Sequence, residues 1–294
     1  MNLIDIDDFD VQQLHRVLDT AAALKAGDRE PPARLEGASL GMLFERPSTR
    51  TRVSFEVGMT QLGGHAVFLG KDDIQLGRGE PVKDTARALS GYVDGVMARV
   101  KSHDSMLELA EYADVPVING LSSDAHPAQT VADLLTIREH CGFDATVAWV
   151  GDGNNVGASF LVGASMVGLD VRAATPEGYG FDDDTVERAR GFAGSVSVGH
   201  DPVAAVDDAD VVYTDVWVSM GEEDERAEKV ADFEGFQLNE ELLAHADDPA
   251  VLHCLPAHRG EEITDDVMES DRELIWAQAE NRLHGQKGLL VELL

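Results

Sequence analysis

Apolar residues recur along the chain in two patterns, short runs typical of buried strands and longer stretches with helical spacing. In the first half, strands are predicted at residues 39–44, 65–69, 94–100 and 115–119. Helices are predicted at residues 50–62, 84–92, 104–113 and 128–140. An earlier helical stretch, within residues 8–27, ends at Gly27, after which Pro31 and Pro32 interrupt the pattern.

The pattern restarts at residue 145, where a strand (145–151) enters a glycine-rich turn followed by a helix of small residues (157–167). Further strands are predicted at 169–175, 195–199 and 210–217, and further helices at 183–193, 202–207 and 276–294. Alternating strands and helices indicate parallel sheets covered by helices on both faces. We therefore expect an α/β protein with two doubly wound domains, residues 1–138 and 139–275.

The charge of the chain narrows the classes of partner. Its 55 acidic side chains outnumber 23 Lys plus Arg, which gives a formal net charge of −32. Hydrophobic residues make up 44%, which is normal for a folded domain and too many for a disordered acidic chain. This charge argues against nucleic acid or a membrane surface as partner, because both are anionic. With many Asp and Glu and few Lys, the surface is suited to high salt.

Cysteines and apolar runs exclude other classes. Cys141 and Cys254 lie too far apart for a disulfide framework or a zinc-ligand spacing. The N-terminal residues lack both the basic segment and the apolar core of a secretory signal. No apolar run reaches the roughly 18 residues that a membrane-spanning helix needs. We expect a globular cytoplasmic protein.

The segment FERPSTRTRVSFE, residues 44–56, is the first candidate for chemistry. Residues 48–51 stand where a helix begins after a strand, and free N–H groups with the helix dipole suit a phosphate there. The guanidinium of Arg50, and that of Arg52, would add charge-assisted hydrogen bonds. An ordinary helix cap followed by exposed arginines is the alternative. Three arginines this close in a chain poor in basic residues favour an anion site.

The segment HPAQT, residues 126–130, places His126 and Gln129 on one side of a helix start. A neutral His donor and an amide can together hold a carbonyl and an amino group. A His that only caps the helix would give the same sequence.

The turn GDGNNVG, residues 151–157, lies between a strand and a helix, as a dinucleotide-binding turn does. Its spacing is GxGxxxG rather than GxGxxG, and the second strand ends in AAT where that fingerprint has an acidic residue. Asn154 and Asn155 are better suited to a polar group of a substrate.

Three segments near the C-terminus carry further candidates. The segment DVWVSMGEE, residues 215–223, follows a parallel strand, so Asp215 could bind an ammonium group unless this is only a loop. The segment HCLPAHRGEEIT, residues 253–264, contains His253 beside Cys254, although adjacent side chains rarely point at each other. Arg282, in AENRLH, would be read as a surface residue if taken alone.

Together, STRTR (48–52), Arg99 in VMARV, HPAQ (126–129) and HCLP (253–256) resemble, in order and spacing, the aspartate/ornithine carbamoyltransferase family. The resemblance runs from about residue 40 to the end of the chain. Within the family, DVWVSMGEE and HCLP resemble the enzymes that use ornithine. Aspartate enzymes usually carry PLPR in place of HCLP and a Lys in the loop that here offers Gln75 and Arg78.

The resemblance implies that the first domain, completed by the helix 276–294 packing back on it, binds carbamoyl phosphate. The phosphate would lie on the helix start and Arg50, with Arg282 returning to it. Thr51, Arg99 and His126 would polarise the carbamoyl oxygen. Gln129 and a backbone carbonyl of Cys254 or Leu255 would hold the carbamoyl amine. The implied set is Ser48, Thr49, Arg50, Thr51, Gln75, Arg99, His126, Gln129, Cys254, Leu255 and Arg282.

The resemblance also implies an ornithine site in the second domain. Asn155 would hold the carboxylate of ornithine and Asp215 its α-ammonium, with Ser219 and Met220 closing over it. The neutral δ-amine would attack the carbonyl carbon and phosphate would leave, giving citrulline. The implied catalytic residues are Arg50, Arg99, His126 and Cys254, with Cys254 positioning the amine rather than bonding to it. We expect no metal and no cofactor, and a homotrimer or a multiple of trimers.

Three alternatives remain open at this stage. The chain could carbamoylate another amine, such as aspartate, putrescine or an acylated ornithine. It could be a nicotinamide-nucleotide-dependent oxidoreductase built on GDGNNVG. It could also be a binding protein of the same fold without activity.

Overall fold

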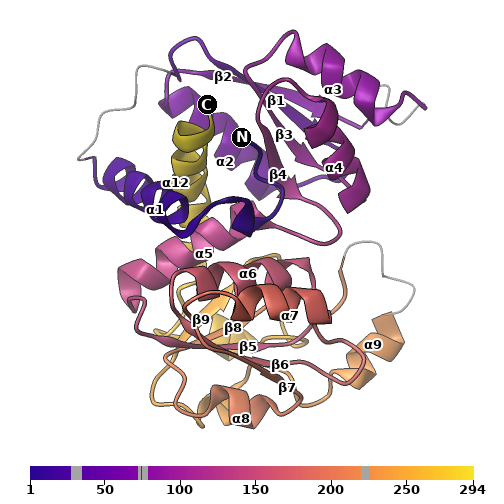
Figure 1. Ribbon diagram of the computed structural model, residues 1–294. Coiled ribbons are helices and arrows are strands. Elements are labelled where there is room, and N and C mark those ends of the chain that lie inside the picture. The colour runs from indigo at the N-terminus through magenta and orange to yellow at the C-terminus, as the bar shows by residue number, and fades with distance from the viewer. Residues whose placement is uncertain (28–34, 72–73, 75–78, 220–225) are drawn as a thin grey trace. The chain divides into compact units, whose positions relative to one another are not determined.

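The computed structural model describes residues 1–27, 35–71, 74, 79–219 and 226–294. The chain divides into two compact units (Figure 1). Unit 1 comprises Met1–Leu135 with Glu280–Leu294, and unit 2 comprises Thr136–Ala279. Among the described residues, no helix has the length and apolar character needed to cross a membrane.

Unit 1 is built on a four-stranded parallel sheet. Its strands are β1 (Ser39–Phe44), β2 (His65–Gly70), β3 (Gly95–Arg99) and β4 (Val117–Leu121). Their order across the sheet is β2-β1-β3-β4, and every neighbouring pair is parallel. The chain proceeds from β1 to one side and from β3 to the other, so the topological switch point lies between β1 and β3. The predicted parallel sheet is confirmed.

The larger helices of unit 1 begin and end close to the predicted positions. They are α1 (Val11–Ala26), α2 (Thr49–Gln61), α3 (Val82–Ser90), α4 (His103–Tyr112), and parts of α5 (Pro127–His140) and α12 (Ile275–Leu293). Asp10 caps α1 by accepting from the Gln13 N–H. Gly27 ends the helix with a left-handed φ of 75°, a conformation that favours glycine.

The last helix packs on unit 1, as expected. A Cβ added to Gly288 of α12 would lie 2.5 Å from the Val17 carbonyl oxygen of α1, so only glycine permits this approach. A Cβ added to Gly58 of α2 would lie 3.7 Å from the Leu290 side chain of α12, which is an ordinary contact distance. Figure 1 shows α12, in yellow, beside α1 and α2.

Unit 2 is built on a five-stranded parallel sheet in the order β7-β6-β5-β8-β9. The strands are β5 (Thr146–Val150), β6 (Asp170–Ala174), β7 (Val196–Gly199), β8 (Val211–Thr214) and β9 (Ala250–His253). The helices are α6 (Asn155–Met166), α7 (Asp183–Arg190), α8 (Pro202–Val206), α9 (Arg226–Asp232), α10 (Glu240–Leu243) and α11 (Asp265–Met268). Its switch point lies between β5 and β8.

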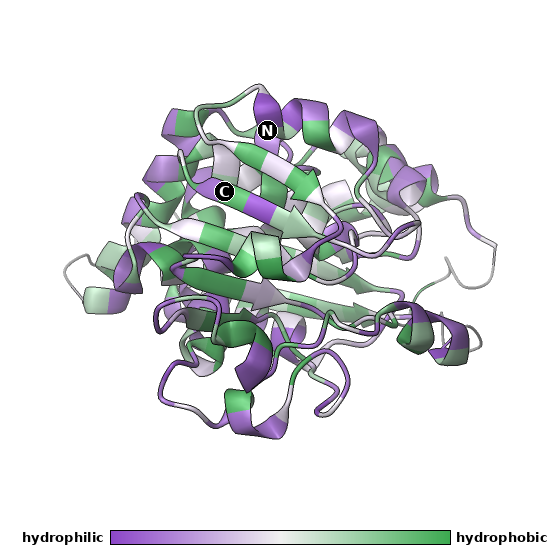
Figure 2. Cartoon of the chain, turned by 90° about the horizontal axis from the view of Figure 1, so that it is seen from below, coloured by the Kyte–Doolittle hydropathy of each residue, from purple (hydrophilic) through white to green (hydrophobic). Residues whose placement is uncertain are grey.

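The core of unit 2 explains the small residues of α6. Trp149, Phe160 and Tyr213 are buried together, with the rings of Trp149 and Tyr213 4.8 Å apart. A Cβ on Gly157 would lie 2.7 Å from the Trp149 ring, so α6 needs glycine there to lie close to the sheet. Figure 2 shows hydrophobic residues along the strands and hydrophilic residues in many loops.

One predicted strand is shorter in the structure, and one observed strand has no predicted counterpart. The strand expected at 210–217 ends at Thr214, because the residues that follow leave the sheet. The strand β9 was not predicted, since its four residues form too short an apolar run after the acidic segment at 247–248.

Candidate functional site

In unit 1, the predicted site residues follow three neighbouring strands. Residues 48–51 come after β1, Arg99 is the last residue of β3, and His126 follows β4. Phe44, the last residue of β1, is paired in register with Arg99. These residues therefore lie at the carboxyl edge of the sheet, next to its switch point, where ligands bind in open α/β sheets.

The start of α2 is the helix terminus that the sequence predicts. Ser48 is the N-cap, and its Oγ accepts from the Thr51 N–H at 3.3 Å. The same hydroxyl donates to Thr51 Oγ1 at 3.1 Å. Arg52 lies elsewhere, since it pairs with Glu56 at 3.1 Å and stacks over the Phe68 ring. Of the two arginines considered for an anion, the structure leaves Arg50 as the candidate.

Arg282 connects three segments of unit 1 that are far apart in the sequence. Its side chain is buried, and Nη2 donates to Thr51 Oγ1 at 3.0 Å. Its Nη1 donates to Gln129 Oε1. Gln129 Nε2 in turn donates to Asp133 Oδ1 at 2.7 Å. The structure thus brings Thr51, Gln129 and Arg282 together, as the resemblance implies.

Asp133 is a member of this network that the sequence analysis missed. It is wholly buried one helical turn after Gln129. A carboxylate can only accept from the amide, so it holds the Gln129 nitrogen and leaves the amide oxygen toward Arg282. The signal that could have identified it is an acidic residue four positions after Gln129, on the same face of a buried helix.

His126 is held in its neutral form. Burial lowers its pKa well below the usual value of 6.5, and the positive charges of Arg282 and Arg99 lower it further. A neutral imidazole can donate one hydrogen bond without adding charge, while the two buried arginines supply the positive potential. The arrangement suits a ligand with a carbonyl oxygen and a phosphate.

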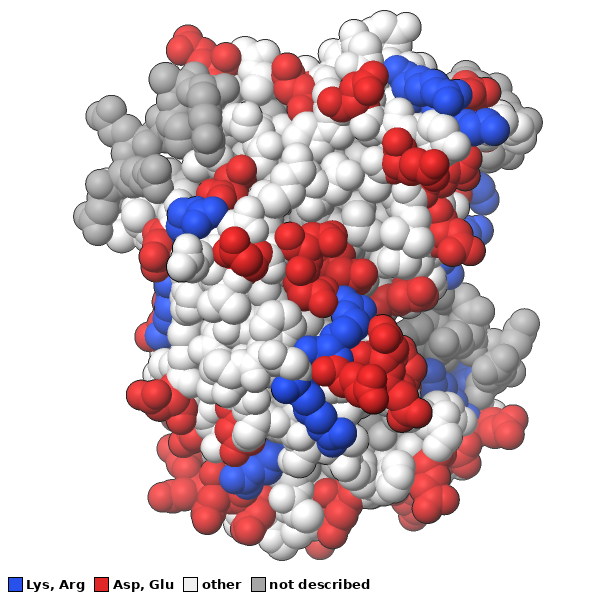
Figure 3. Space-filling model, in the orientation of Figure 1, with Lys and Arg blue, Asp and Glu red and all other residues white. Residues whose placement is uncertain are grey.

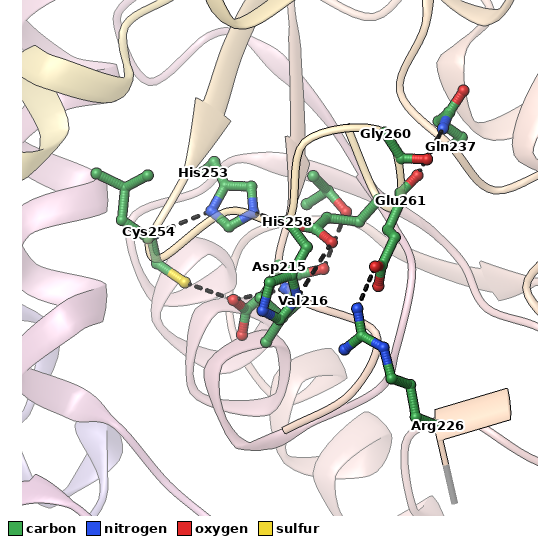
Figure 4. Close-up of polar contacts among 12 residues, drawn as sticks. Asp215, Val216, Arg226, Gln237, His253, Cys254, His258, Gly260 and Glu261 are labelled. Atoms are coloured by element: carbon green, nitrogen blue, oxygen red, sulfur yellow. Dashed lines mark hydrogen bonds and ion pairs between the residues drawn. The ribbon is translucent and has the colours of Figure 1, made fainter. Parts of the chain in front are cut away.

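In unit 2, the predicted residues also follow strands on either side of the switch point. Asn155 comes after β5, Asp215 after β8 and Cys254 after β9. The Cys254 thiol donates to Asp215 Oδ1 at 2.8 Å, which also accepts from the Val216 N–H at 2.8 Å. Figure 4 shows Cys254 pointing toward Asp215. A buried carboxylate at this edge suits an ammonium group.

The structure places the other asparagine and lid residues considered for ornithine in different situations. Asn154 caps α6 by accepting from the Val156 and Gly157 N–H groups, and its Nδ2 donates to Asp215 Oδ2 at 2.8 Å. Its role is therefore to position Asp215. Asn155 and Ser219 are half-buried. Among the predicted residues, Gln75 and Met220 lie outside the described part of the chain, as does Arg78.

His253 does not activate Cys254. Its Nδ1 accepts from the Leu255 N–H at 2.9 Å, so the proton lies on Nε2, which faces Glu262 Oε1 at 3.0 Å. Both ring nitrogens are thus engaged with groups other than the thiol. The geometry argues against a Cys–His nucleophile.

The glycines of GDGNNVG are needed for packing within the chain. A Cβ on Gly153 would lie 2.6 Å from the Gly180 backbone, and Gly157 faces the Trp149 ring. These contacts explain the glycines without a bound pyrophosphate. The motif therefore gives no support for a nicotinamide site.

Comparison with known proteins agrees with this geometry. The profile of the aspartate/ornithine carbamoyltransferase carbamoyl-P binding domain matches residues 1–139, and that of the Asp/Orn binding domain matches residues 144–293. The chain is 62% identical to an ornithine carbamoyltransferase of Haloquadratum walsbyi, covering 100% of this chain and 97% of the relative.

Two solved structures are similar over nearly the whole chain. The structure of ornithine carbamoyltransferase from Pyrococcus furiosus has a TM-score of 0.95 and 50% identity, covering 99% of this chain and 96% of the other. That of the anabolic ornithine carbamoyltransferase from Campylobacter jejuni has a TM-score of 0.94 and 41% identity, covering 99% and 98%.

Proposed function

The chain belongs to the aspartate/ornithine carbamoyltransferase family, and on that basis we propose that it carbamoylates the δ-amine of L-ornithine, giving L-citrulline and phosphate. The observation that carries the proposal is the full-length similarity to proteins named ornithine carbamoyltransferase. The geometry of each unit fits it, because unit 1 gathers groups suited to a phosphate and a carbonyl, and unit 2 presents a carboxylate beside a thiol.

Unit 1 binds carbamoyl phosphate in this proposal. The phosphate lies on the N-terminus of α2, where Ser48, Thr49 and Thr51 offer N–H and hydroxyl groups. Arg50 and Arg282 add charge-assisted hydrogen bonds. The family resemblance assigns Gln75 to the same ligand. This assignment is supported by the helix start after β1 and by the return of Arg282 to Thr51.

The carbamoyl group meets a separate set of donors. Thr51, Arg99 and His126 polarise its oxygen, which becomes negative as the tetrahedral intermediate forms. Because His126 is neutral, it contributes as a donor, and Arg99 supplies the charge. Gln129, oriented by Asp133, accepts from the carbamoyl amine together with a backbone carbonyl of Cys254 or Leu255.

Unit 2 binds ornithine. Asp215 accepts from the α-ammonium, Asn155 holds the carboxylate, and Ser219 and Met220 complete the site. The δ-nitrogen forms a bond to the carbamoyl carbon and loses a proton, while the bond from that carbon to the phosphate oxygen breaks. Phosphate leaves with the electron pair. Cys254, which donates to Asp215, positions the amine without a covalent intermediate.

The acceptor specificity is tested by steady-state rates with ornithine, aspartate, putrescine and N-acetylornithine, each with carbamoyl phosphate. The proposal expects kcat/KM for ornithine to exceed that for each other amine by at least about 100-fold. Putrescine and N-acetylornithine have no free α-ammonium and would leave Asp215 unpaired, whereas aspartate has no δ-amine to attack the carbamoyl carbon. An equal or higher rate with another acceptor would assign the chain to a different branch of the family.

The proposal includes an assembly of homotrimers, or of a multiple of trimers, which the family resemblance supports. Light scattering of the purified chain at high salt measures this directly. A monomer that is fully active would contradict it.

A further inference from the structure

The turn that follows Cys254 contains a second group of ligating atoms, which the proposed reaction does not use. His258, Glu261 and Glu262 lie between β9 and α11 in unit 2. Each offers one atom suited to a metal ion, and these atoms lie within 4.8 Å of one another. Figure 4 shows His258 and Glu261 in this turn, with the Glu261 carboxylate facing Arg226.

One polar atom of each of these residues shares an unusual condition. His258 Nδ1, Glu261 Oε2 and Glu262 Oε2 are each buried from solvent and have no hydrogen-bond partner among the described residues. His258 Nδ1 and Glu262 Oε2 are 3.9 Å apart, too far for a hydrogen bond. Buried polar atoms are nearly always satisfied, so an unsatisfied atom on each of three neighbouring residues calls for a ligand.

Each carboxylate is held by its other oxygen. Glu262 Oε1 accepts from the His258 backbone N–H at 2.5 Å and faces His253 Nε2 at 3.0 Å. Glu261 Oε1 is paired with Arg226. The protein thus fixes both carboxylates and leaves the second oxygen of each in the group, an arrangement typical of metal ligands that are oriented by surrounding residues.

The charges in the turn favour a cation. The Glu262 side chain is fully buried, and His253 faces it with Nε2 alone, because His253 Nδ1 accepts from the Leu255 N–H. Arg226 balances only Glu261. A buried carboxylate without a compensating positive charge is costly.

We propose that His258 Nδ1, Glu261 Oε2 and Glu262 Oε2 bind one divalent transition-metal ion. One imidazole and two carboxylates suit Mn²⁺ or Zn²⁺, and the absence of a thiolate from this group favours Mn²⁺ over softer ions. The His258 side chain is 38% exposed, which gives the ion a route from solvent. The ion would cross-link the turn. Through Glu262 and its partner His253, it would also hold the turn to the end of β9. It takes no part in carbamoyl transfer.

The test is a titration of the full chain with MnCl₂ after chelator treatment, in KCl, with free Mn²⁺ measured by electron paramagnetic resonance. One bound Mn²⁺ per chain is expected. His258→Ala and Glu261→Gln should each weaken binding by at least about tenfold, because even the loss of a residue that only orients a metal ligand typically costs about 10–100-fold. The matched control is Glu269→Gln, which alters an exposed carboxylate of the same unit.

Another set of possible metal ligands, Asp215, His253 and Cys254, belongs to the site already described. Cys254→Ser separates the two groups, because it should leave Mn²⁺ binding unchanged. Circular dichroism checks that each variant is folded. If His258→Ala does not fold, the test is made with Glu261→Gln. The proposal is overturned if the wild-type chain binds no Mn²⁺ at millimolar concentration. Binding that survives loss of His258 and Glu261, or that Cys254→Ser abolishes, overturns it equally.

Discussion

Arg282 donates a hydrogen bond to Thr51 Oγ1 at 3.0 Å, although 231 residues separate the two in the sequence. The contact joins the last helix to the first residues of α2. The same guanidinium also binds Gln129 Oε1. Unit 1 therefore brings Thr51, Gln129 and Arg282 together only when α12 is in place.

Arg282→Gln should weaken carbamoyl phosphate binding, because a buried cation is lost where the phosphate is proposed to lie. Hydrogen bonds to charged groups contribute about 1.5–3 kcal/mol, so kcat/KM for carbamoyl phosphate should fall roughly 10–100-fold. Arg16→Gln is the matched control, since Arg16 forms an exposed ion pair with Glu292 of α12, the helix that also carries Arg282. Its rates should stay within about twofold. An unchanged KM for carbamoyl phosphate in Arg282→Gln would remove this residue from the site.

Asp133→Asn should impair catalysis through Gln129. The new amide can donate as well as accept, so Gln129 would no longer be fixed with its oxygen toward Arg282. We expect kcat/KM for carbamoyl phosphate to fall about tenfold, a typical cost for one hydrogen bond in a buried network. In a Gln129→Ala background the same substitution should have no further effect. Additive losses in the double variant would show that Asp133 acts independently of Gln129.

Cys254 should tolerate replacement by serine. Cys254→Ser keeps a donor to Asp215 and should keep turnover within about tenfold, whereas Cys254→Ala loses that donor and should raise the KM for ornithine. The KM for carbamoyl phosphate should not change in either variant. Loss of all detectable turnover in both would instead indicate a covalent role.

The pH dependence of stability should carry the signature of His126. Its pKa is lowered in the folded protein, while the unfolded value is near 6.5. Below about pH 6.5 the unfolded chain therefore binds a proton that the folded chain does not, so stability falls as the pH decreases. Urea unfolding between about pH 8 and pH 5.5 should show a smaller loss for His126→Gln than for the wild type. Parallel curves would contradict the assignment.

Much of the fold follows from local sequence patterns. The pattern locates each strand from β1 to β7 within a few residues, and Ser48 marks the start of α2. The strand β9 is missed because four residues carry too little periodicity. Nothing local distinguishes Arg282, because its partners Thr51 and Gln129 lie on other helices. Asp133 has a local signal, since it lies one turn after Gln129 on the same helix, but the pattern does not show which acidic residue is buried.

The candidate site divides in the same way. Arg99, His126 and Asp215 lie at the carboxyl ends of parallel strands, which the parallel topology predicts. The use of Asn154 as a cap and as a partner of Asp215 depends on distances across β5 and β8, which only the folded chain reveals. Which substrate atom each residue contacts stays a prediction.

The acidic surface should make the enzyme depend on salt. Asp and Glu gather in patches on the face shown in Figure 3. Asp182, Asp183 and Asp184 at the start of α7 are exposed, whereas Arg99 and Arg282 are buried. Near 1 M salt the Debye length is about 3 Å, so repulsion between the surface carboxylates is screened while the buried arginines still act locally. Activity and assembly should both fall at about 0.05 M salt, where screening extends over more than 10 Å.

Sucrose at the same osmolarity is the control for salt, since it does not screen charge and should not restore activity. Light scattering and initial rates across the salt series measure both effects. Full activity with an intact oligomer at about 0.05 M salt would contradict this view of the surface charge.

The most direct test of the proposed reaction follows the carbamoyl carbon itself. Purified full-length chain is incubated at high salt with ¹³C-labelled carbamoyl phosphate and ornithine, and carbon and phosphorus NMR spectra are recorded together. The account predicts that the label appears in the ureido carbon of citrulline, with one phosphate released for each citrulline formed. Phosphate release without labelled citrulline, or no turnover above the rate without protein, would contradict it.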